Sequence, residues 1–249
     1  MLQNGSFSEG WETLPAIVEA NFLRNQRPHG WQVEWQAMGE PLYDDPNVKV
    51  RGIPECVHKL SKQLPKHEQL GGENALILEG NAVYKIFSGG AEFGTTLSQT
   101  VTGLQPGSQA KLVVPIQVHR HGDPDVFGAE SGVWVNGEGE WVHSEKMGDR
   151  KWYKHKIKFT VPDNGEAQII IRVKSKWQRP KDFFFDGIKL EAKEPAVLPV
   201  VDPKPPVHVG ETKTVFVQLP QGVQVKQGVC DEANVVEVNA GPGVKIEIV

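Results

Sequence analysis

The stretch "AKLVVPIQVHRHGDPD" carries a dense set of side chains able to bind a ligand or a metal ion. If it forms a strand, alternate residues face the same side, so Gln117, His119 and His121 share one face. Their imidazole and amide groups could hydrogen-bond a polar ligand or simply face solvent. Asp123 and Asp125 extend the spacing to His-x-His-x-Asp-x-Asp, which could instead hold a transition metal such as zinc.

Acidic and aromatic residues continue this set in and around a Gly-rich loop. Aromatic rings stack on the C–H faces of sugars, and planar polar groups make paired hydrogen bonds to hydroxyls. Trp31 and Trp35, four residues apart, could form a second aromatic patch. The predicted sugar-binding set is Gln117, His119, His121, Asp123, Asp125, Glu130, Trp134, Trp141, Trp31 and Trp35. Each tryptophan could instead belong to a β-sandwich core.

Asp186 interrupts the apolar stretch "DFFFDGIKLE", which otherwise reads as a deeply buried strand. A buried carboxylate without a partner costs several kcal/mol or stays protonated. The side chain therefore needs compensation. It could cap a turn, pair with Arg172 or Lys189, or take an active part in a site.

Catalytic signatures are missing from the sequence. It contains no nucleophile elbow, phosphate-binding loop or HExxH motif. Glycosidase chemistry needs two carboxyl groups at a fixed separation, but Glu130, Glu138 and Glu140 fall in Gly-rich turns where we expect solvation. Cys56 and Cys230 have neither metal-binding nor redox spacing and are expected to be unpaired thiols. We predict that the chain is not an enzyme.

Short runs of alternating polarity, separated by Gly and Pro, indicate the elements that position these residues. The predicted strands lie within 74–80, 110–122, 131–145, 152–162, 166–177 and 182–191. Helical turns are expected only near 14–25 and 54–65. Pro115 suggests an edge position or a bulge in its strand. This pattern predicts an all-β jelly-roll β-sandwich of two antiparallel sheets.

The composition changes near residue 193, which divides the chain into three parts. We predict one sandwich domain over 1–192, large enough for a sizeable core. A Pro-rich, extended linker follows over 193–210. Residues 211–249 form a small β-rich extension, either packed on the first domain or part of a truncated module, and further domains are expected in the full-length protein.

Charge and hydropathy exclude some classes of partner. The formal net charge is -4 over 249 residues, so no general nucleic-acid binding is expected. A basic, aromatic-bearing face in "KWYKHKIKF" and "RVKSKWQRPK" is more simply explained by solvation than by an anionic polymer. No apolar stretch reaches the length of a membrane span, and "MLQNGSFSEGW" lacks the regions of a signal peptide.

Three stretches together resemble jelly-roll carbohydrate-binding modules found beside bacterial glycoside hydrolases and in cell-surface proteins. They are "LQNGSFSEGW" (2–11), "GTTLSQTVTGLQPGSQAKLVVPIQV" (94–118) and "DFFFDGIKLE". Ala110 replaces the usual tyrosine of the second motif, and Gly187 replaces the second acid of the third. The segment 12–69 is longer than is usual in the family, which could cover or rebuild a binding face.

The resemblance implies a structural calcium ion that joins the first and last strands. By that resemblance Asp186 would supply a carboxylate, Ser6 and Glu9 further oxygens, and Glu79 could complete the set, since Ca²⁺ prefers oxygen ligands. It also implies an extracellular or cell-surface location and a carbohydrate partner.

Three hypotheses follow for function. The first is a non-catalytic carbohydrate-binding module that targets an attached enzyme or surface protein to a polysaccharide. The second is a structural or adhesive β-sandwich with a protein partner. The third, which the sequence favours least, is a hydrolase of jelly-roll fold.

Overall fold

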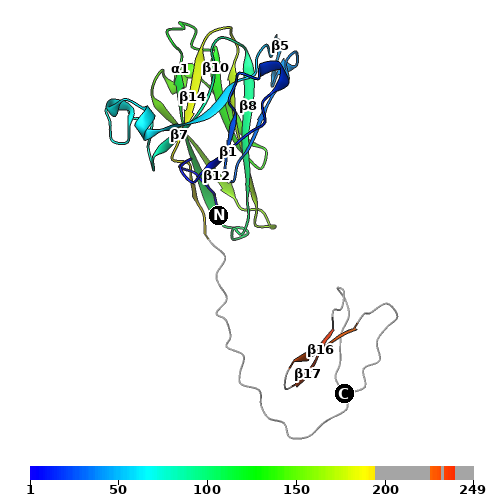
Figure 1. Ribbon diagram of the computed structural model, residues 1–249. Coiled ribbons are helices and arrows are strands. Elements are labelled where there is room, and N and C mark those ends of the chain that lie inside the picture. The colour runs from blue at the N-terminus through cyan, green and yellow to red at the C-terminus, as the bar shows by residue number, and fades with distance from the viewer. Residues whose placement is uncertain (194–224, 231–232, 239–249) are drawn as a thin grey trace. The chain divides into compact units, whose positions relative to one another are not determined.

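The computed structural model describes residues 1–193, 225–230 and 233–238 (Figure 1). The chain divides into two units, Met1–Val197 and Leu198–Val249. Two antiparallel sheets dominate the first unit, so the predicted all-β jelly-roll sandwich is confirmed.

A five-stranded sheet forms one layer. Its strands, in spatial order, are β11 (Glu138–His143), β10 (Ala129–Val135), β13 (Ala167–Ser175), β8 (Phe93–Val101) and β3 (Gln32–Trp35). Asn136 and Gly137 join β10 to β11 with positive φ angles of 52° and 87°. Such an Asn-Gly pair suits a tight hairpin, because its backbone matches the twist of the flanking strands.

The second layer is a six-stranded sheet. Its strands, in spatial order, are β12 (Trp152–Thr160), β9 (Gln109–His119), β14 (Lys181–Phe185), β7 (Ala82–Ser88) and β6 (Glu55–Leu60), with β15 (Lys189–Glu191) also paired to β9. Strand β12 forms one edge, and its Lys154, Lys156 and Lys158 are exposed.

Smaller elements surround the sheets. Two hairpins pair β1 (Trp11–Thr13) with β2 (Gln26–Pro28) and β4 (Pro41–Leu42) with β5 (Asp45–Lys49). The helical elements are η1 (Val18–Ala20), η2 (Ser61–Gln63), η3 (Lys66–Glu68) and α1 (Ser144–Met147). The expected helical turns near 14–25 and 54–65 are η1 and η2, although 54–65 also contains strand β6, which pairs with β7. The strand predicted within 74–80 is wrong, because these residues form a loop before β7. None of the helices among the described residues is long and apolar enough to cross a membrane.

The core lies between the facing sides of the two sheets. Val114, Ile116 and Val118 of β9 are fully buried, as are Ile169 and Ile171 of β13. Burying each such side chain contributes roughly 1.5–3 kcal/mol. The side of β9 that faces the core is thus the one predicted from the alternation of its polar and apolar residues.

Pro115 lies inside β9, where neither the predicted edge position nor the predicted bulge accommodates it. On one side it pairs with Lys154 of β12. On the other side, β14 pairs with β9 from Ile116 onward and β15 pairs up to Val113, so no strand residue faces Pro115. The missing N–H therefore falls where the neighbouring strand changes.

The two distant motifs at the ends of the first unit meet, as predicted. The Phe7 ring stacks on Tyr84 at 5.5 Å between centroids, and Tyr84 lies 6.4 Å from Phe185. The Ile188 N–H donates to the Gly5 carbonyl at 2.9 Å. The amino-terminal segment contacts the sheet as a loop, however, and is not a neighbouring strand.

Within the second unit, β16 (Val225–Cys230) and β17 (Ala233–Val238) form an antiparallel hairpin. These are two of the short strands predicted over 211–249. The predicted linker 193–210 lies outside the described residues except for Lys193.

Candidate functional site

The polar face predicted on β9 is not open to solvent at Gln117 and His119, which are 4% and 5% exposed. The His119 Nε2 and Gln117 Oε1 atoms lie 2.7 Å apart, and the His119 ring lies 4.6 Å from Phe184. Burial, assisted by the positive charge of Arg150, lowers the pKa of His119 to about 4. The prediction of a solvent-facing strand is wrong at these two residues.

A segment of the long amino-terminal region covers this part of the sheet. Leu64, Leu76 and Ile77 form an apolar cluster with Phe184 over its outer face. The Trp152 indole N–H donates to the Ala75 carbonyl at 2.8 Å and so fixes the segment. The long segment 12–69 contributes Leu64 to this cover, whereas Leu76 and Ile77 follow that segment.

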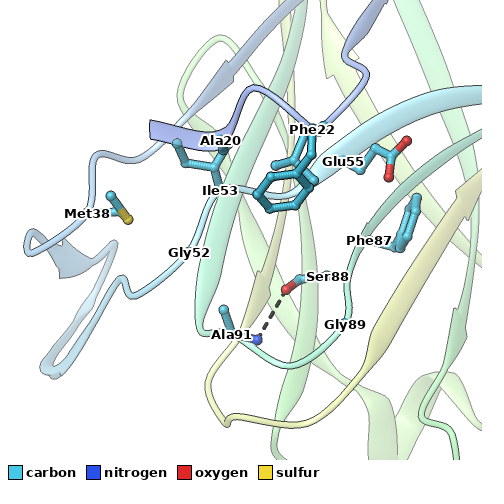
Figure 2. Close-up of a pocket in the computed structure, with 11 residues that line it drawn as sticks. Ala20, Phe22, Met38, Gly52, Ile53, Glu55, Phe87, Ser88, Gly89 and Ala91 are labelled. Carbon is cyan, nitrogen blue, oxygen red and sulfur yellow. Dashed lines mark hydrogen bonds between the residues drawn. The ribbon is translucent and has the colours of Figure 1, made fainter. Parts of the chain in front are cut away.

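Two hollows remain beside this cover on the outer side of the six-stranded sheet. One, of about 320 Å³, is apolar and is bordered by Phe22, Met38, Ile53 and Phe87 (Figure 2). The other, of about 250 Å³, is lined by polar groups including Lys59, Glu68, Lys85, His119 and Asp182.

The remaining residues of the predicted histidine and aspartate motif point to different partners. His121 Nε2 lies 3.0 Å from Asp182 Oδ2, and Lys181 Nζ donates to Asp123 Oδ2 at 2.6 Å. Asp125 Oδ1 accepts the Phe127 N–H at 2.7 Å. Among the described residues, no three His, Cys, Asp or Glu side chains are grouped to hold a metal ion, so the zinc alternative lacks a ligand set.

The second predicted aromatic patch is not formed. Trp31 is 1% exposed, belongs to the core and donates from Nε1 to the Asn4 carbonyl at 3.3 Å. Trp35 is half-buried at the end of β3, opposite Thr95. Trp31 is a core residue because its ring packs on Phe7.

The other tryptophan pair does meet, on the outer side of the five-stranded sheet. The rings of Trp134 and Trp141 lie 5.0 Å apart at 80°. A Cβ atom at Gly132 would collide with the far end of the Trp134 indole, and one at Gly139 would collide with its near end. These two glycines therefore let the Trp134 ring lie along the sheet surface.

Arg172 and Tyr43 complete this cluster, which we call the aromatic face (Tyr43, Trp134, Trp141 and Arg172). The Arg172 guanidinium lies 5.1 Å from the Tyr43 ring centroid and 5.3 Å from that of Trp134. Arg172 forms no salt bridge with the described residues, and its buried Nε atom lacks a hydrogen-bond partner among them. Burial raises the pKa of Tyr43 to about 12, although its hydroxyl is hydrogen-bonded to Thr96.

Strand register explains why these residues share a surface. Directly paired residues of neighbouring strands point to the same side of a sheet. Glu34 of β3 pairs with Thr96 of β8, which pairs with Arg172 of β13. Arg172 pairs in turn with Gly132 of β10, and Gly132 with Trp141 of β11.

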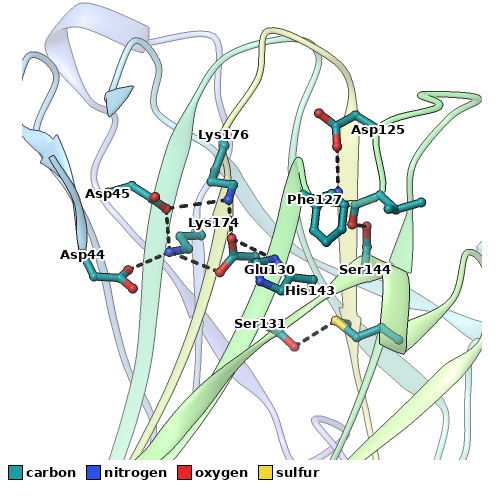
Figure 3. Close-up of polar contacts among 12 residues, drawn as sticks. Asp44, Asp45, Asp125, Phe127, Glu130, Ser131, His143, Ser144, Lys174 and Lys176 are labelled. Atoms are coloured by element: carbon teal, nitrogen blue, oxygen red, sulfur yellow. Dashed lines mark hydrogen bonds and ion pairs between the residues drawn. The ribbon is translucent and has the colours of Figure 1, made fainter. Parts of the chain in front are cut away.

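Figure 3 shows a cluster of acids and lysines that includes Asp44, Asp45, Glu130, Lys174 and Lys176. Lys174, 1% exposed, places its Nζ 2.6 Å from Asp44, 2.7 Å from Asp45 and 3.2 Å from Glu130. Lys176 Nζ lies 2.5 Å from the other oxygen of Glu130. Glu130, predicted as a ligand contact, is 3% exposed and bound by both lysines, so it is a structural ion-pair partner.

Lys174 also links this cluster to the aromatic face. Its ammonium lies 4.2 Å from the Trp141 ring centroid. Asp44 and Asp45 directly follow Tyr43, so the lysine anchors the turn between β4 and β5 that carries this tyrosine. The cation–π contact thus holds Trp141 in place, and the charge pairing holds the turn that carries Tyr43.

The sequence did not reveal a buried Ser131–His155 pair, whose Oγ and Nε2 atoms lie 2.8 Å apart. Both side chains face the core, and burial lowers the pKa of His155 to about 4. Ser131 Oγ also contacts the Met147 sulfur at 3.2 Å. Ser131 is fully buried, whereas His155 is 6% exposed and borders a hollow of about 280 Å³.

Main-chain groups compensate the buried Asp186. Its Oδ2 accepts the N–H groups of Leu78 at 2.6 Å and Glu79 at 3.0 Å, and its Oδ1 accepts that of Gly187 at 2.7 Å. Burial raises its pKa to about 7, and these three hydrogen bonds oppose the rise. Of the alternatives considered from the sequence, the structure supports local hydrogen bonding, not pairing with Arg172 or Lys189.

The predicted calcium ligands do not form a ligand set. The Glu79 carboxylate pairs with Lys189. The Ser6 carbonyl accepts the Ser8 hydroxyl, and the Glu9 N–H donates to Asn4. N–H donors facing the Asp186 oxygens compete with a cation for their lone pairs. The arrangement of the described residues therefore does not fit calcium.

No protein-family model and no curated protein matches the chain. Among solved structures, it is similar to TmCBM61 in complex with β-1,4-galactotriose, at 16% identity over 77% of this chain and 97% of that one, with a TM-score of 0.47. The CBM22-1 xylan-binding domain of Paenibacillus barcinonensis Xyn10C gives 13% identity, 77% and 94% coverage, and a TM-score of 0.36.

An enzymatically active domain is also among the similar structures. Tailspike protein 4 of bacteriophage CBA120 gives 9% identity over 77% of this chain and 21% of that one, with a TM-score of 0.43. The ligands and activities named for these proteins belong to those proteins.

Proposed function

We propose that residues 1–192 form a non-catalytic carbohydrate-binding module whose ligand lies on the aromatic face. The observation that carries the proposal is the Trp134 ring, laid along the sheet by Gly132 and Gly139. An indole in this orientation presents its face outward, where it can stack on the C–H face of a sugar.

Polar groups around this ring supply the hydrogen bonds that sugar recognition also needs. Arg172 has guanidinium donors that no carboxylate of the described residues occupies. Thr96 and Glu34 lie in the same cross-strand row and can bind hydroxyls. A ring for stacking next to planar donors and acceptors is typical of carbohydrate sites.

A catalytic role finds less support in the same region. Both oxygens of Glu130 are occupied by lysine ammonium groups, and the Ser131–His155 pair is buried. A glycosidase needs two accessible carboxyl groups on either side of its substrate. We therefore propose that the module binds an extracellular polysaccharide and targets an attached enzyme or surface protein to it.

The proposal is tested by measuring binding to a panel of soluble polysaccharides, by calorimetry or affinity electrophoresis. Trp134→Ala should reduce affinity at least tenfold, and Trp141→Ala should reduce it less. Trp177→Ala is the matched control, because Trp177 is 41% exposed on Gly128, outside the aromatic face. Unchanged affinity in Trp134→Ala would refute this site. Absence of any glycan binding by the unaltered protein would favour the structural or adhesive alternative.

A further inference from the structure

The three rings of the aromatic face do not lie in one plane. Trp134 and Trp141 meet at 80°, and Tyr43 is tilted by 47° from Trp141. A crystalline polysaccharide presents its sugar rings as a flat surface, so several stacking rings would have to be coplanar to bind it. This face cannot offer more than one ring to such a surface.

Trp134 is the ring that the two glycines let lie along the sheet, and the Arg172 guanidinium lies 5.3 Å from its centroid. The Lys174 ammonium covers one face of Trp141 at 4.2 Å, and Trp141 stands upright beside Trp134. The Tyr43 hydroxyl is bonded to Thr96 at 2.9 Å, which holds that ring against β8. The two indole rings therefore meet nearly at a right angle and do not form a shared flat surface.

Arg172 is placed to bind the edge of a sugar that rests on Trp134. Its planar guanidinium can donate two parallel hydrogen bonds to adjacent oxygen acceptors. Because it lies between Tyr43 and Trp134, its orientation is restricted before a ligand arrives. Neighbouring hydroxyls of a sugar or a carboxylate could both accept such a pair.

The surrounding charges favour sugar hydroxyls over a carboxylate as the acceptors of these hydrogen bonds. The bases of the surface are Arg172, Lys174 and Lys176, and its acids are Glu34, Asp44, Asp45 and Glu130, with His143 beside Glu130. The acids outnumber the permanently charged bases. A carboxylate-bearing sugar would therefore approach a surface of its own sign, whereas a neutral one would not.

We infer that the aromatic face selects neutral, soluble glycan chains, holding one sugar unit on Trp134 with Arg172 bonded to its hydroxyls. This inference rests on the proposed function and narrows its ligand class. Flat crystalline polymers are excluded by the angles between the rings, and acidic polymers are disfavoured by the surrounding carboxylates.

Matched polymers test the inference. Affinity electrophoresis would compare hydroxyethylcellulose with carboxymethylcellulose and β-1,4-galactan with polygalacturonate, alongside xylan and galactomannan. A pull-down with microcrystalline cellulose tests flat surfaces. We expect binding to at least one neutral polymer, at least tenfold weaker binding to its acidic counterpart, and no retention on the crystalline polymer.

Arg172→Lys keeps the charge but loses the paired donors, so it should reduce affinity for the neutral ligand about tenfold. Thermal melting would show whether this variant remains folded, and Lys49→Met on the exposed part of β5 is its control. Raised salt should improve binding of the acidic polymer by screening the repulsion.

Several results would overturn the inference while leaving the proposed function intact. They are tighter binding of an acidic polymer, retention on microcrystalline cellulose that Trp134→Ala abolishes, and unchanged neutral-ligand affinity in folded Arg172→Lys. Failure of every glycan to bind would refute the proposed function itself, and the inference with it.

Discussion

At the scale of single residues, Gly132 decides the orientation of the main stacking ring. We predict that Gly132→Ala reduces glycan affinity about tenfold, or about 1.4 kcal/mol, because its Cβ would displace the Trp134 indole. Binding titration measures the effect. Gly89→Ala is the control, since a Cβ there meets nothing within 4 Å. Equal affinity in both variants would mean that the flat ring is not needed.

Asp186 provides a second prediction at this scale. An amide in its place would put an N–H group against the Gly187 N–H, leaving a buried donor unpaired. Asp186→Asn should therefore lower the free energy of unfolding by about 1–3 kcal/mol, measured by urea denaturation. Asp163→Asn, in an exposed turn, should have little effect. A neutral result at Asp186 would show that its three hydrogen bonds are dispensable.

Residue types alone predicted part of the site that we propose. Trp134 and Trp141 were predicted from their position beside glycines, and the structure brings them together. Tyr43 and Arg172 were missed as ligand contacts because their proximity depends on strand register. The signal that could have suggested a flat ring was Gly132, two residues before Trp134 and hence on the same side of the strand.

At the scale of elements, the turn between β4 and β5 depends on Lys174. Lys174→Met should cost about 3 kcal/mol, near the lower limit for breaking a buried ion pair, because Asp44 can turn to solvent. It should also weaken glycan binding by releasing Tyr43. Urea denaturation and binding titration measure the two effects, with Lys49→Met as control. Normal binding by a folded variant would contradict the anchoring role.

The amino-terminal loop gives another prediction for an element. A hydrogen bond joins this loop to Ile188 beyond the end of β14, and ring stacking joins it to Tyr84 of β7, so we propose that no metal ion is needed there. Exhaustive treatment with EDTA, verified by elemental analysis, should therefore leave the melting temperature unchanged. A drop that added Ca²⁺ reverses would restore the calcium hypothesis and contradict this account.

The elements also show where sequence reasoning reached its limit. Alternation predicted correctly which side of β9 faces the core. It could not reveal that Leu64, Leu76 and Ile77 cover the other side, because that contact joins segments far apart in the chain. A polar residue in an alternating strand therefore predicts which side of the sheet its side chain lies on, but not whether solvent reaches that side chain.

At the scale of the whole molecule, four buried groups determine how stability depends on pH. Burial lowers the pKa of His58 to about 3 and those of His119 and His155 to about 4. The unfolded chain then binds more protons at these sites below pH 6.5, so stability falls as the pH falls. Asp186, with its pKa raised to about 7, has the opposite effect between about pH 4 and 7.

Because three histidines oppose one aspartate, the net effect follows the histidines. We predict that the free energy of unfolding decreases from pH 6.5 toward pH 4 by about 2 kcal/mol per pH unit. The reason is that the unfolded chain binds roughly one to two more protons than the folded chain in this range. Urea denaturation at several pH values measures this slope. His155→Gln should flatten it, whereas exposed His67→Gln should not. A flat profile for the unaltered protein would contradict the burial of these rings.

Among the described residues β12 forms an edge of its sheet, and its lysines have a consequence for the behaviour of the protein in concentrated solution. An unpaired strand edge is a template on which other chains can add, and charge is one means of discouraging that addition. Lys154, Lys156 and Lys158 bring like charges together whenever two such edges approach. Colloidal stability should therefore be greatest at low ionic strength and decline as salt weakens this repulsion.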